Sequence, residues 1–353
     1  MMRESTTVSI GNRMIGAGEA PYVIAEMSAN HLGDFDRAIR ILEAAADAGA
    51  DAVKLQTYTA DTITIDHDGP GFVIEGGLWD GERLYELYRR ASTPWEWHGP
   101  LMERGKALGI DVFSSPFDPT AVAFLDELDA PAIKIASCEC IDLPLIRQAA
   151  ETGRPIILST GMANEEEIDE AVETVRTAGN GNLVLLHCVS GYPTPPDESA
   201  LRTIPDMATR FDCPVGLSDH TLGTAVPVAA VALGAVMIEK HFTLSRADGG
   251  PDAPFSLEPD ELRRLVVDTK TAWQALGTVD YGLKTSEKET RPFRRSLYIV
   301  EDIAAGGELT PLNCRSIRPG YGLPPKHLPA VLGRRAAKDI KKGTPLTWPL
   351  LEP

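Results

Sequence analysis

Short apolar runs alternate with longer amphipathic stretches from residue 22 to residue 276 of the chain. The short runs are apolar almost without interruption, which is typical of parallel strands that are buried on both faces. They cover residues 22–27, 52–56, 111–115, 132–136, 155–159, 183–188, 214–218 and 236–241. The stretches between them have helical periodicity over residues 35–48, 94–108, 119–128, 143–151, 165–178, 200–211, 224–233 and 259–276.

Eight strand–helix units in about 250 residues indicate an α/β fold of the (β/α)8 TIM-barrel type. Proline stands near the start of several predicted helices and glycine follows several of their ends, which suits the backbone of helix termini. A doubly wound sheet is the alternative arrangement. The regularity of the eight units and the lack of a glycine-rich phosphate loop favour a closed barrel.

Two segments of the predicted barrel domain, residues 1–278, lie outside the repeating pattern. Residues 7–20 are predicted to form a hairpin that closes the bottom of the barrel, with its turn at Gly11 and Asn12. Residues 59–92 form a long insertion after the second strand. Loops of this length at the C-terminal rim usually shape access for a substrate.

The pattern changes after the barrel. A polar linker is predicted over residues 279–291, followed by a small β-rich domain over residues 292–353 with the short runs SLYIV, RSIRPG and PLTWPL. A β-rich module of about 60 residues is marginally stable alone, so we expect it to pack against a partner surface.

Composition excludes several classes of protein. The 353 residues carry 34 Lys and Arg against 51 Asp and Glu, a net charge of −17, which argues against binding nucleic acid through phosphates. Hydrophobic residues at 43% and charged residues at 24% indicate a globular protein rather than a disordered one. Neither a secretory signal nor a membrane helix is expected. Five cysteines suggest reduced thiols, so we expect a cytoplasmic protein.

Polar side chains are predicted at the C-terminal end of every strand, where the active site of a TIM barrel lies. Lys54 and Lys134 lie within strands and therefore need partners. A buried salt bridge would satisfy each lysine, but several serines around the same mouth favour a small anion such as a phosphate or carboxylate. His220 and His241 lie at matching depth on adjacent strands, with Asp219 and Glu239 beside them, and this pair indicates a catalytic divalent metal.

Seven motifs resemble those of the sialic acid synthase family, whose members condense phosphoenolpyruvate (PEP) with amino-sugar aldehydes to make nonulosonic acids. They are AEMSANH (25–31), KLQTY (54–58), SSPFD (114–118), KIAS (134–137), STGMA (159–163), GLSDHT (216–221) and IEKHFTL (238–244). Residues 292–353 resemble the antifreeze-like (SAF) domain of that family.

Further motifs point to branches within the family. TPWEWH (93–98), GGPDAPFSLEP (249–259) and FRRSL (293–297) are most similar to the pseudaminic acid branch. LLHCVSGYPTP (185–195) resembles the sialic acid branch, because pseudaminic enzymes more often have lysine at the position of His187. The resemblance implies condensation of PEP with 2,4-diacetamido-2,4,6-trideoxy-L-altrose and water, giving pseudaminic acid and phosphate by C–O cleavage. A synthase of N-acetylneuraminate or legionaminate with the same chemistry is the alternative.

The resemblance also implies roles for individual residues. The PEP-binding set corresponds to Lys54, Ser115, Lys134, Ser137, Ser159, Ser190 and Ser218. The metal ligands correspond to His220 and His241, with Mn²⁺ expected and Co²⁺ or Mg²⁺ as other candidates. Residues near the sugar and the reacting carbons correspond to Glu26, Gln56, Tyr192, Glu239 and Asp252. Arg318 matches an arginine that reaches the partner's active site in a domain-swapped homodimer.

In the expected reaction, the PEP C3 carbon attacks the aldehyde, water adds at C2 and phosphate leaves. Glu26 and Glu239 are the candidates for proton handling, and the sequence does not decide between them. Two other readings remain at this stage: a different metal-dependent aldolase or lyase on the same barrel, and a sugar-binding or scaffold protein without activity.

Overall fold

The computed structural model describes residues 7–353, which divide into two compact units between Gly277 and Thr278. This division falls one residue before the predicted end of the barrel domain at residue 278. The first unit contains the helices and strands that carry the predicted catalytic chemistry. Each unit is described by itself below.

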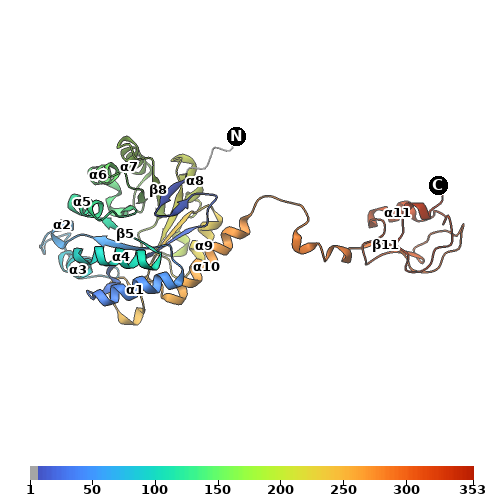
Figure 1. Ribbon diagram of the computed structural model, residues 1–353, viewed down its shortest axis with the longest axis horizontal. Coiled ribbons are helices and arrows are strands. Elements are labelled where there is room, and N and C mark those ends of the chain that lie inside the picture. Colours follow the sequence, from blue (N-terminus) through green and yellow to red (C-terminus); the bar gives the residue numbers. More distant parts are fainter. Residues whose placement is uncertain (1–6) are drawn as a thin grey trace. The chain divides into compact units, whose positions relative to one another are not determined.

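Eight parallel strands close into a barrel in the order β10-β3-β4-β5-β6-β7-β8-β9. In Figure 1 the helices surround these strands on the outside, as expected for a TIM barrel. The strands are β3 (Tyr22–Glu26), β4 (Ala52–Thr57), β5 (Asp111–Pro116), β6 (Ile133–Ile135), β7 (Ile156–Ser159), β8 (Leu183–Cys188), β9 (Val215–Asp219) and β10 (Met237–His241). All eight predicted strands are therefore confirmed.

The main helices follow the predicted positions closely. They are α1 (Phe35–Ala48), α4 (His98–Leu108), α5 (Pro119–Glu127), α6 (Leu143–Glu151), α7 (Glu165–Thr177), α8 (Thr203–Arg210), α9 (Ala225–Ala232) and α10 (Pro259–Leu276). Short polar side chains define several starts: Asp34 accepts a hydrogen bond from the Arg37 amide, and Asn164 forms a capping box with Glu167.

The insertion after β4 contains structure that the periodicity of the sequence did not separate. It forms α2 (Ala60–Ile63) and α3 (Leu84–Ala91). α3 has eight residues, of which Leu87 and Ala91 are buried, so its apolar pattern is short. The segment between the two helices is held by the hydrogen bond from the Ile74 amide to the Glu82 carbonyl.

The N-terminal hairpin closes the lower end of the barrel, as predicted. β1 (Val8–Ile10) and β2 (Arg13–Ile15) pair antiparallel, and their apolar side chains join the same buried cluster as Tyr22 and Phe113 inside the barrel. Gly11 forms the turn with φ +52°, and a Cβ atom there would lie 2.5 Å from the Asp111 carboxylate. The barrel is therefore filled from below, and its open mouth is at the C-terminal ends of the strands.

The second unit has its own small core. β11 (Ser296–Ile299) and β12 (Cys314–Ile317) pair antiparallel, and the cluster around Leu297, Ile340 and Leu346 is buried. The predicted third β run, PLTWPL, forms only an isolated bridge from Pro345 to Tyr298 and then a 3-10 turn. Proline lacks the N–H group that a continuous strand ladder requires, which explains this difference.

None of the helices among the described residues 7–353 is long and apolar enough to cross a membrane. All five cysteines have free thiols.

Candidate active site

The strand register brings charged side chains into one row at the mouth of the barrel. Glu26, the last residue of β3, lies opposite Lys54 of β4 on one side and His241 of β10 on the other. Glu239 of β10 lies opposite Ser218 of β9. The alternation of side chains along each strand places these residues on the same inner face, so positions far apart in the sequence meet in one site.

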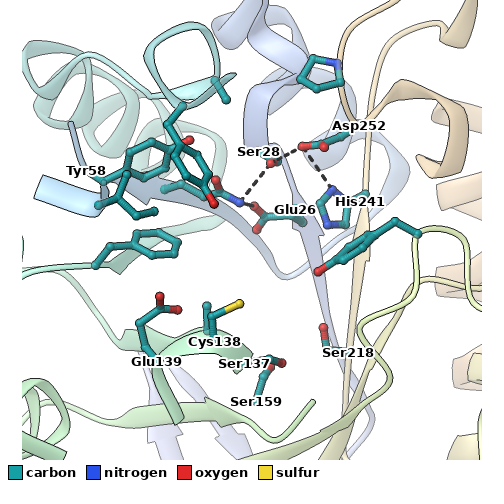
Figure 2. A pocket seen from close by; sticks show the side chains of 18 of the residues that line it. Glu26, Ser28, Tyr58, Ser137, Cys138, Glu139, Ser159, Ser218, His241 and Asp252 are labelled. Atoms are coloured by element: carbon teal, nitrogen blue, oxygen red, sulfur yellow. Dashed lines mark hydrogen bonds and ion pairs between the residues drawn. The ribbon is translucent and has the colours of Figure 1, made fainter. Parts of the chain in front are cut away.

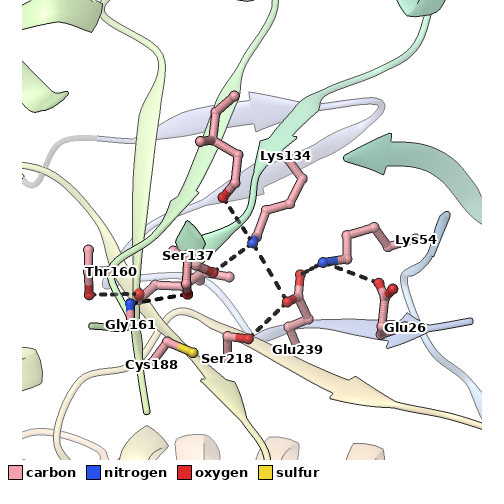
Figure 3. Close-up of polar contacts among 12 residues, drawn as sticks. Glu26, Lys54, Lys134, Ser137, Thr160, Gly161, Cys188, Ser218 and Glu239 are labelled. Atoms are coloured by element: carbon pink, nitrogen blue, oxygen red, sulfur yellow. Dashed lines mark hydrogen bonds and ion pairs between the residues drawn. The ribbon is translucent and has the colours of Figure 1, made fainter. Parts of the chain in front are cut away.

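Two lysines and two glutamates form the buried centre of this site (Figure 3). Lys54 Nζ lies 3.2 Å from Glu26 Oε2 and 3.0 Å from Glu239 Oε2. Lys134 Nζ donates a hydrogen bond of 2.6 Å to Ser159 Oγ and lies 3.8 Å from Glu239 Oε1. The prediction that each lysine needs a partner is confirmed, and the partners within the protein are carboxylates and a hydroxyl.

The two glutamates differ in protonation because their surroundings differ. Burial raises the pKa of Glu26 to about 7, although Lys54 opposes this shift. Burial acts on Glu239 as well, but Lys134 and Lys54 outweigh it and lower the pKa of Glu239 to about 2. Ser218 adds to this by donating a hydrogen bond of 2.9 Å to Glu239. Glu239 is therefore a permanent anion near neutral pH, whereas Glu26 can take up and release a proton.

A second group of hydroxyls lies beside Lys134. Ser137 Oγ accepts a hydrogen bond of 3.1 Å from the Gly161 amide. A Cβ atom on Gly161 would lie 2.3 Å from Ser190 Oγ and 2.8 Å from Ser137 Oγ. Glycine at this position therefore allows two hydroxyls to converge near Lys134, an arrangement that suits an anionic oxygen.

Ser115 is one of two predicted PEP-binding residues that do not line the pocket. It lies on β5 opposite Gln56, is buried, and its hydroxyl has no hydrogen-bond partner. Ser137, Ser159, Ser218 and both lysines line the pocket at the barrel mouth, whereas neither Ser115 nor Ser190 is among its lining residues.

His220 and His241 lie side by side, with 5.4 Å between their ring centroids. The Nδ1 of His220 is 3.0 Å from the Val189 carbonyl oxygen, which leaves Nε2 as the free nitrogen. The Nδ1 of His241 is buried without a hydrogen-bond partner, 3.9 Å from Asp252 Oδ2. A ring held through one nitrogen by a carbonyl, beside a ring with an unpaired nitrogen, fits two ligands of a metal ion.

The acids next to these histidines have other partners. Asp219 forms a buried ion pair of 2.6 Å with Lys240 and accepts a hydrogen bond from Thr221, while Glu239 pairs with Lys54. Among residues 7–353, no group of three or more His, Cys, Asp or Glu side chains is arranged to hold a metal ion. Any metal here would have two imidazole ligands from the protein and would take its other ligands from water or substrate.

The predicted sugar-binding residues meet on the histidine side of the pocket. Gln56 Nε2 donates hydrogen bonds of 3.0 Å to both Glu26 Oε1 and Ser28 Oγ. Ser28 in turn hydrogen-bonds to Asp252, whose pKa is raised by burial. The sequence analysis missed Ser28, although it lies within the motif AEMSANH. Tyr192 also belongs here, since its ring centroid is 4.4 Å from that of His220.

Two further predicted residues lie elsewhere. The His187 Nε2–H group donates a hydrogen bond of 2.7 Å to the Ser199 carbonyl, and His187 is not among the residues that line the pocket. In the motif LLHCVSGYPTP, the residue that resembles the sialic acid branch, His187, therefore lies outside the pocket lining. Arg318 belongs to the second unit, where it follows β12 directly.

The pocket has a volume of about 580 Å³ and includes residues that the sequence did not single out. Apart from Ser28, they are mostly apolar or aromatic side chains from the insertion and nearby loops, together with Glu139 and two cysteines. They include Tyr58, Ile63, Ile74, Trp79, Leu84, Leu87, Tyr88, Phe117 and Glu139. The sequence around these residues has no pattern that marks them as part of a site, so their place in the pocket is seen only in the folded structure.

The fold and the site together define a class of protein: a TIM barrel in which lysines, serine hydroxyls and paired imidazoles surround a pocket at the strand ends. Residues 41–281 match the model of the NeuB family, and residues 294–352 match that of the SAF domain. This chain belongs to the NeuB family.

Relatives of known name extend over nearly the whole chain. It is 43% identical over 339 residues to the pseudaminic acid synthase of Campylobacter jejuni, covering 96% of this chain and 98% of that one. It is 34% identical to the N,N'-diacetyllegionaminic acid synthase of Legionella pneumophila, covering 96% of each. The solved structure of an N-acetylneuraminic acid synthetase from Leptospira borgpetersenii has a TM-score of 0.73 at 33% identity, covering 82% of this chain and 96% of that one.

Proposed function

We propose that this chain is a pseudaminic acid synthase. It condenses PEP with 2,4-diacetamido-2,4,6-trideoxy-L-altrose and water, giving pseudaminic acid and inorganic phosphate. The observation that carries this proposal is the convergence of Lys134, the serine hydroxyls and two imidazoles in one pocket beside a glutamate with a raised pKa. The 43% identity to a pseudaminic acid synthase, against 34% to a legionaminic one, supports this substrate over its alternative.

PEP is expected to bind at Lys134 and the serines around it. Lys134 is the better candidate of the two lysines, because its nearest partner is the neutral Ser159 hydroxyl and Glu239 is 3.8 Å away. Lys54 is instead held between two carboxylates. Fixing the phosphate and the carboxylate of PEP would turn two mobile reactants into one aligned pair.

His220 and His241 would hold a divalent metal ion, for which Mn²⁺ is our candidate. The buried, unpaired Nδ1 of His241 and the carbonyl-bound ring of His220 support this assignment. When bound, the ion supplies a Lewis acid for the aldehyde oxygen of the sugar. Gln56, Ser28 and Asp252 would orient the sugar beside it through their hydrogen-bonded chain.

Glu26 is the residue that we propose to handle the proton. The bond between PEP C3 and the sugar aldehyde carbon forms first and leaves a cationic centre at C2. Glu26, with a pKa near 7, then takes a proton from the water that adds at C2. The C–O bond to phosphate breaks afterwards: phosphate departs with the electron pair of that bond, and the new C2 hydroxyl loses its proton to become the ketone. Of the two protons of the added water, one ends on the alkoxide formed from the aldehyde and the other on the phosphate. Glu239, which stays ionised, would stabilise the positive charge at C2.

We also propose that the chain works as a homodimer in which the SAF unit of one copy completes the site of the other through Arg318. The exposure of Tyr321 and Phe293, at 66% and 61%, supports this, because such large apolar side chains favour a partner surface.

Phosphate release from PEP in the presence of Mn²⁺ tests the proposed substrate. We expect the fastest release with the trideoxy-altrose sugar, and release slower by about tenfold or more with N-acetylmannosamine or the legionaminic acid precursor. EDTA should abolish it, and added Mn²⁺ should restore it. Release with one of the other sugars alone would overturn the substrate assignment, and no release with any of them would overturn the proposed function.

A further inference from the structure

The pocket has two unlike sides. Figure 2 shows His241 and Asp252 on one side of Glu26, with Tyr58 and Glu139 on the other. The first side is polar and carries the paired histidines and Asp252. The second side is a wall of apolar and aromatic side chains, which we call the apolar wall: Tyr58, Ile63, Ile74, Leu84, Leu87, Tyr88 and Phe117.

The apolar wall is built largely by the insertion after β4. Tyr58 forms its base, with edge-on contacts to Tyr88 at 5.8 Å and to Phe117 at 5.1 Å between ring centroids. Trp79, also in the insertion, crosses to the other side of the mouth, where its Nε1 donates a hydrogen bond of 3.1 Å to the Pro251 carbonyl. Its ring lies 5.7 Å from that of Tyr192. The wall is therefore held in place from both sides of the barrel mouth.

Glu139 is the acidic group next to this wall. It lies in the turn Ser137–Ile141 after β6, and its Oε2 atom is buried without a hydrogen-bond partner. Burial raises the pKa of Glu139 to about 7. The chemistry assigned to the site so far gives this carboxyl no role. A buried carboxyl oxygen without a partner is costly, so a ligand that supplies one would recover this cost on binding.

We propose that Glu139 and the apolar wall form the subsite for the distal half of the sugar, with Glu139 hydrogen-bonded to an acetamido group and the wall in contact with its methyl groups. This inference rests on the proposed function, since it assigns substrate groups to the pocket that the reaction uses. It makes Glu139, Ile74 and Leu84 determinants of specificity for N-acetylated, deoxygenated sugars.

The positions of the two reacting groups determine the direction in which the sugar extends. Its aldehyde must reach His220 and His241, and PEP occupies the side of Lys134 and Ser159. The remaining carbons then extend past Glu26 toward Glu139 and the apolar wall (Figure 2). A trideoxy sugar with two acetamido groups presents a C6 methyl, two acetyl methyls and two amide N–H donors. These groups match an apolar surface with one unpaired acceptor.

N-acetylmannosamine is the contrasting ligand. It carries a hydroxymethyl group where the trideoxy sugar carries its methyl, and a hydroxyl in place of the second acetamido group. A hydroxymethyl group against Ile74 and Leu84 would lose hydration without gaining a partner. Apolar pockets discriminate modestly between groups of this kind, by about tenfold to two-hundredfold.

The test compares variants of the wall and of Glu139 with matched controls. Ile74→Ser places a hydroxyl in the wall, and Leu84→Asn is a second wall variant should the first unfold. The control is Ile65→Ser, on the same insertion but 59% exposed. Glu139→Ala removes the carboxyl, and Glu139→Gln replaces it with an amide of the same shape. The control is Glu151→Gln, at an exposed position at the end of α6.

We expect the wall variants to lower the ratio of kcat/KM for the trideoxy-altrose sugar over N-acetylmannosamine by about tenfold. Glu139→Ala should raise the KM for the sugar by about tenfold or more, Glu139→Gln should restore most of the loss, and the KM for PEP should stay within about twofold throughout. Saturation-transfer NMR gives a readout without turnover: the sugar methyl signals should be strong with the unaltered protein and weak with Ile74→Ser.

Two results would overturn the inference, and they differ in what they imply for the function. In the first, the unaltered protein turns over the trideoxy-altrose sugar, but the variants match their controls in the kcat/KM ratio of the two sugars, in the KM for the sugar and in the methyl signals. The subsite is then wrong and the function stands. If the unaltered protein neither binds the sugar nor releases phosphate with it, the proposed function fails and the subsite fails with it.

Discussion

Lys54 and Glu239 form a buried ion pair in which Nζ lies 3.0 Å from Oε2. Lys54 also contacts Glu26, so its charge is already balanced inside the protein. Lys134 is different, because its closest contact is with the neutral Ser159 hydroxyl. In the proposed reaction the two lysines would have separate tasks: Lys54 would hold the two glutamates in position, and Lys134 would remain available to an incoming anion.

The first prediction follows from this division. Lys134→Met should raise the KM for PEP by about a hundredfold, since it removes a charge-assisted contact to the anion. Lys54→Met should act mainly on kcat, because it disturbs the two glutamates rather than the anion. Steady-state kinetics with varied PEP will separate these effects. Equal losses in KM from both variants would contradict the division of tasks.

The second prediction concerns Glu26. Glu26→Gln should lower kcat by about 10²-fold to 10⁴-fold, which is the usual contribution of a positioned base, with little change in the KM for PEP. Glu26 accepts a proton only when ionised, so kcat/KM of the unaltered protein should rise with pH through about 7, where the pKa of Glu26 lies. In Glu26→Gln this rise of kcat/KM with pH should disappear, apart from any pH dependence that arises from the ionisation of PEP itself. A variant with unaltered kcat and the same profile would refute the role of Glu26.

The third prediction concerns the paired histidines. His241→Ala or His220→Ala should abolish the binding of one Mn²⁺ per chain, measured by titration calorimetry or electron paramagnetic resonance. The exposed His67 serves as the control, since His67→Ala should bind Mn²⁺ as the unaltered protein does. Retention of full Mn²⁺ affinity in both active-site variants would place the metal elsewhere.

The fourth prediction separates a structural lysine from the two in the pocket. Lys240→Met should leave Asp219 buried without its 2.6 Å partner and should lower the free energy of unfolding by about 3–5 kcal/mol. Denaturant unfolding measures this change. The folded fraction should retain a KM for PEP close to that of the unaltered protein, because the Lys240–Asp219 pair is not among the pocket lining. A large rise in that KM would mean that the pair belongs to the site.

The fifth prediction tests the domain-swapped homodimer. Glu26→Gln and Arg318→Ala should each be nearly inactive alone. A mixed dimer should regain activity, because one of its barrels combines an intact Glu26 with an intact Arg318 from the other copy. Mixing and refolding the two variants, followed by an activity assay, measures this. A monomeric mass in solution, or no recovery in verified mixed dimers, would contradict the arrangement.

The barrel was predictable because its signals are local. Each strand is a nearly continuous apolar run, and several helices begin or end at a residue such as Asp34 or Gly49 that specifies the backbone there. The strand ends then bring Lys54, Glu26 and Glu239 together as a consequence of the fold. The pairing of Lys54 with two carboxylates was harder to predict from the sequence, because it depends on the register of neighbouring strands rather than on sequence spacing.

The rest of the pocket could not be derived from the sequence in the same way. Ser28 and Asp252 are 224 positions apart and meet only because β10 lies next to β3 in the closed barrel. The helix α3 was missed because it spans only eight residues of a long insertion, which gives a short apolar pattern. Glu139 carries no motif that distinguishes it from a surface acid, and only the tertiary structure shows its buried, unpaired oxygen.

The most direct test of the central claim, that this pocket joins PEP to the sugar with cleavage of the C–O bond of PEP, uses PEP labelled with ¹⁸O at the bridging oxygen. The protein is incubated with the labelled PEP, Mn²⁺ and the trideoxy-altrose sugar, and mass spectrometry locates the label. We predict that the released phosphate carries the ¹⁸O and that the nine-carbon product carries none. Label retained in the product, or no phosphate released, would contradict the account.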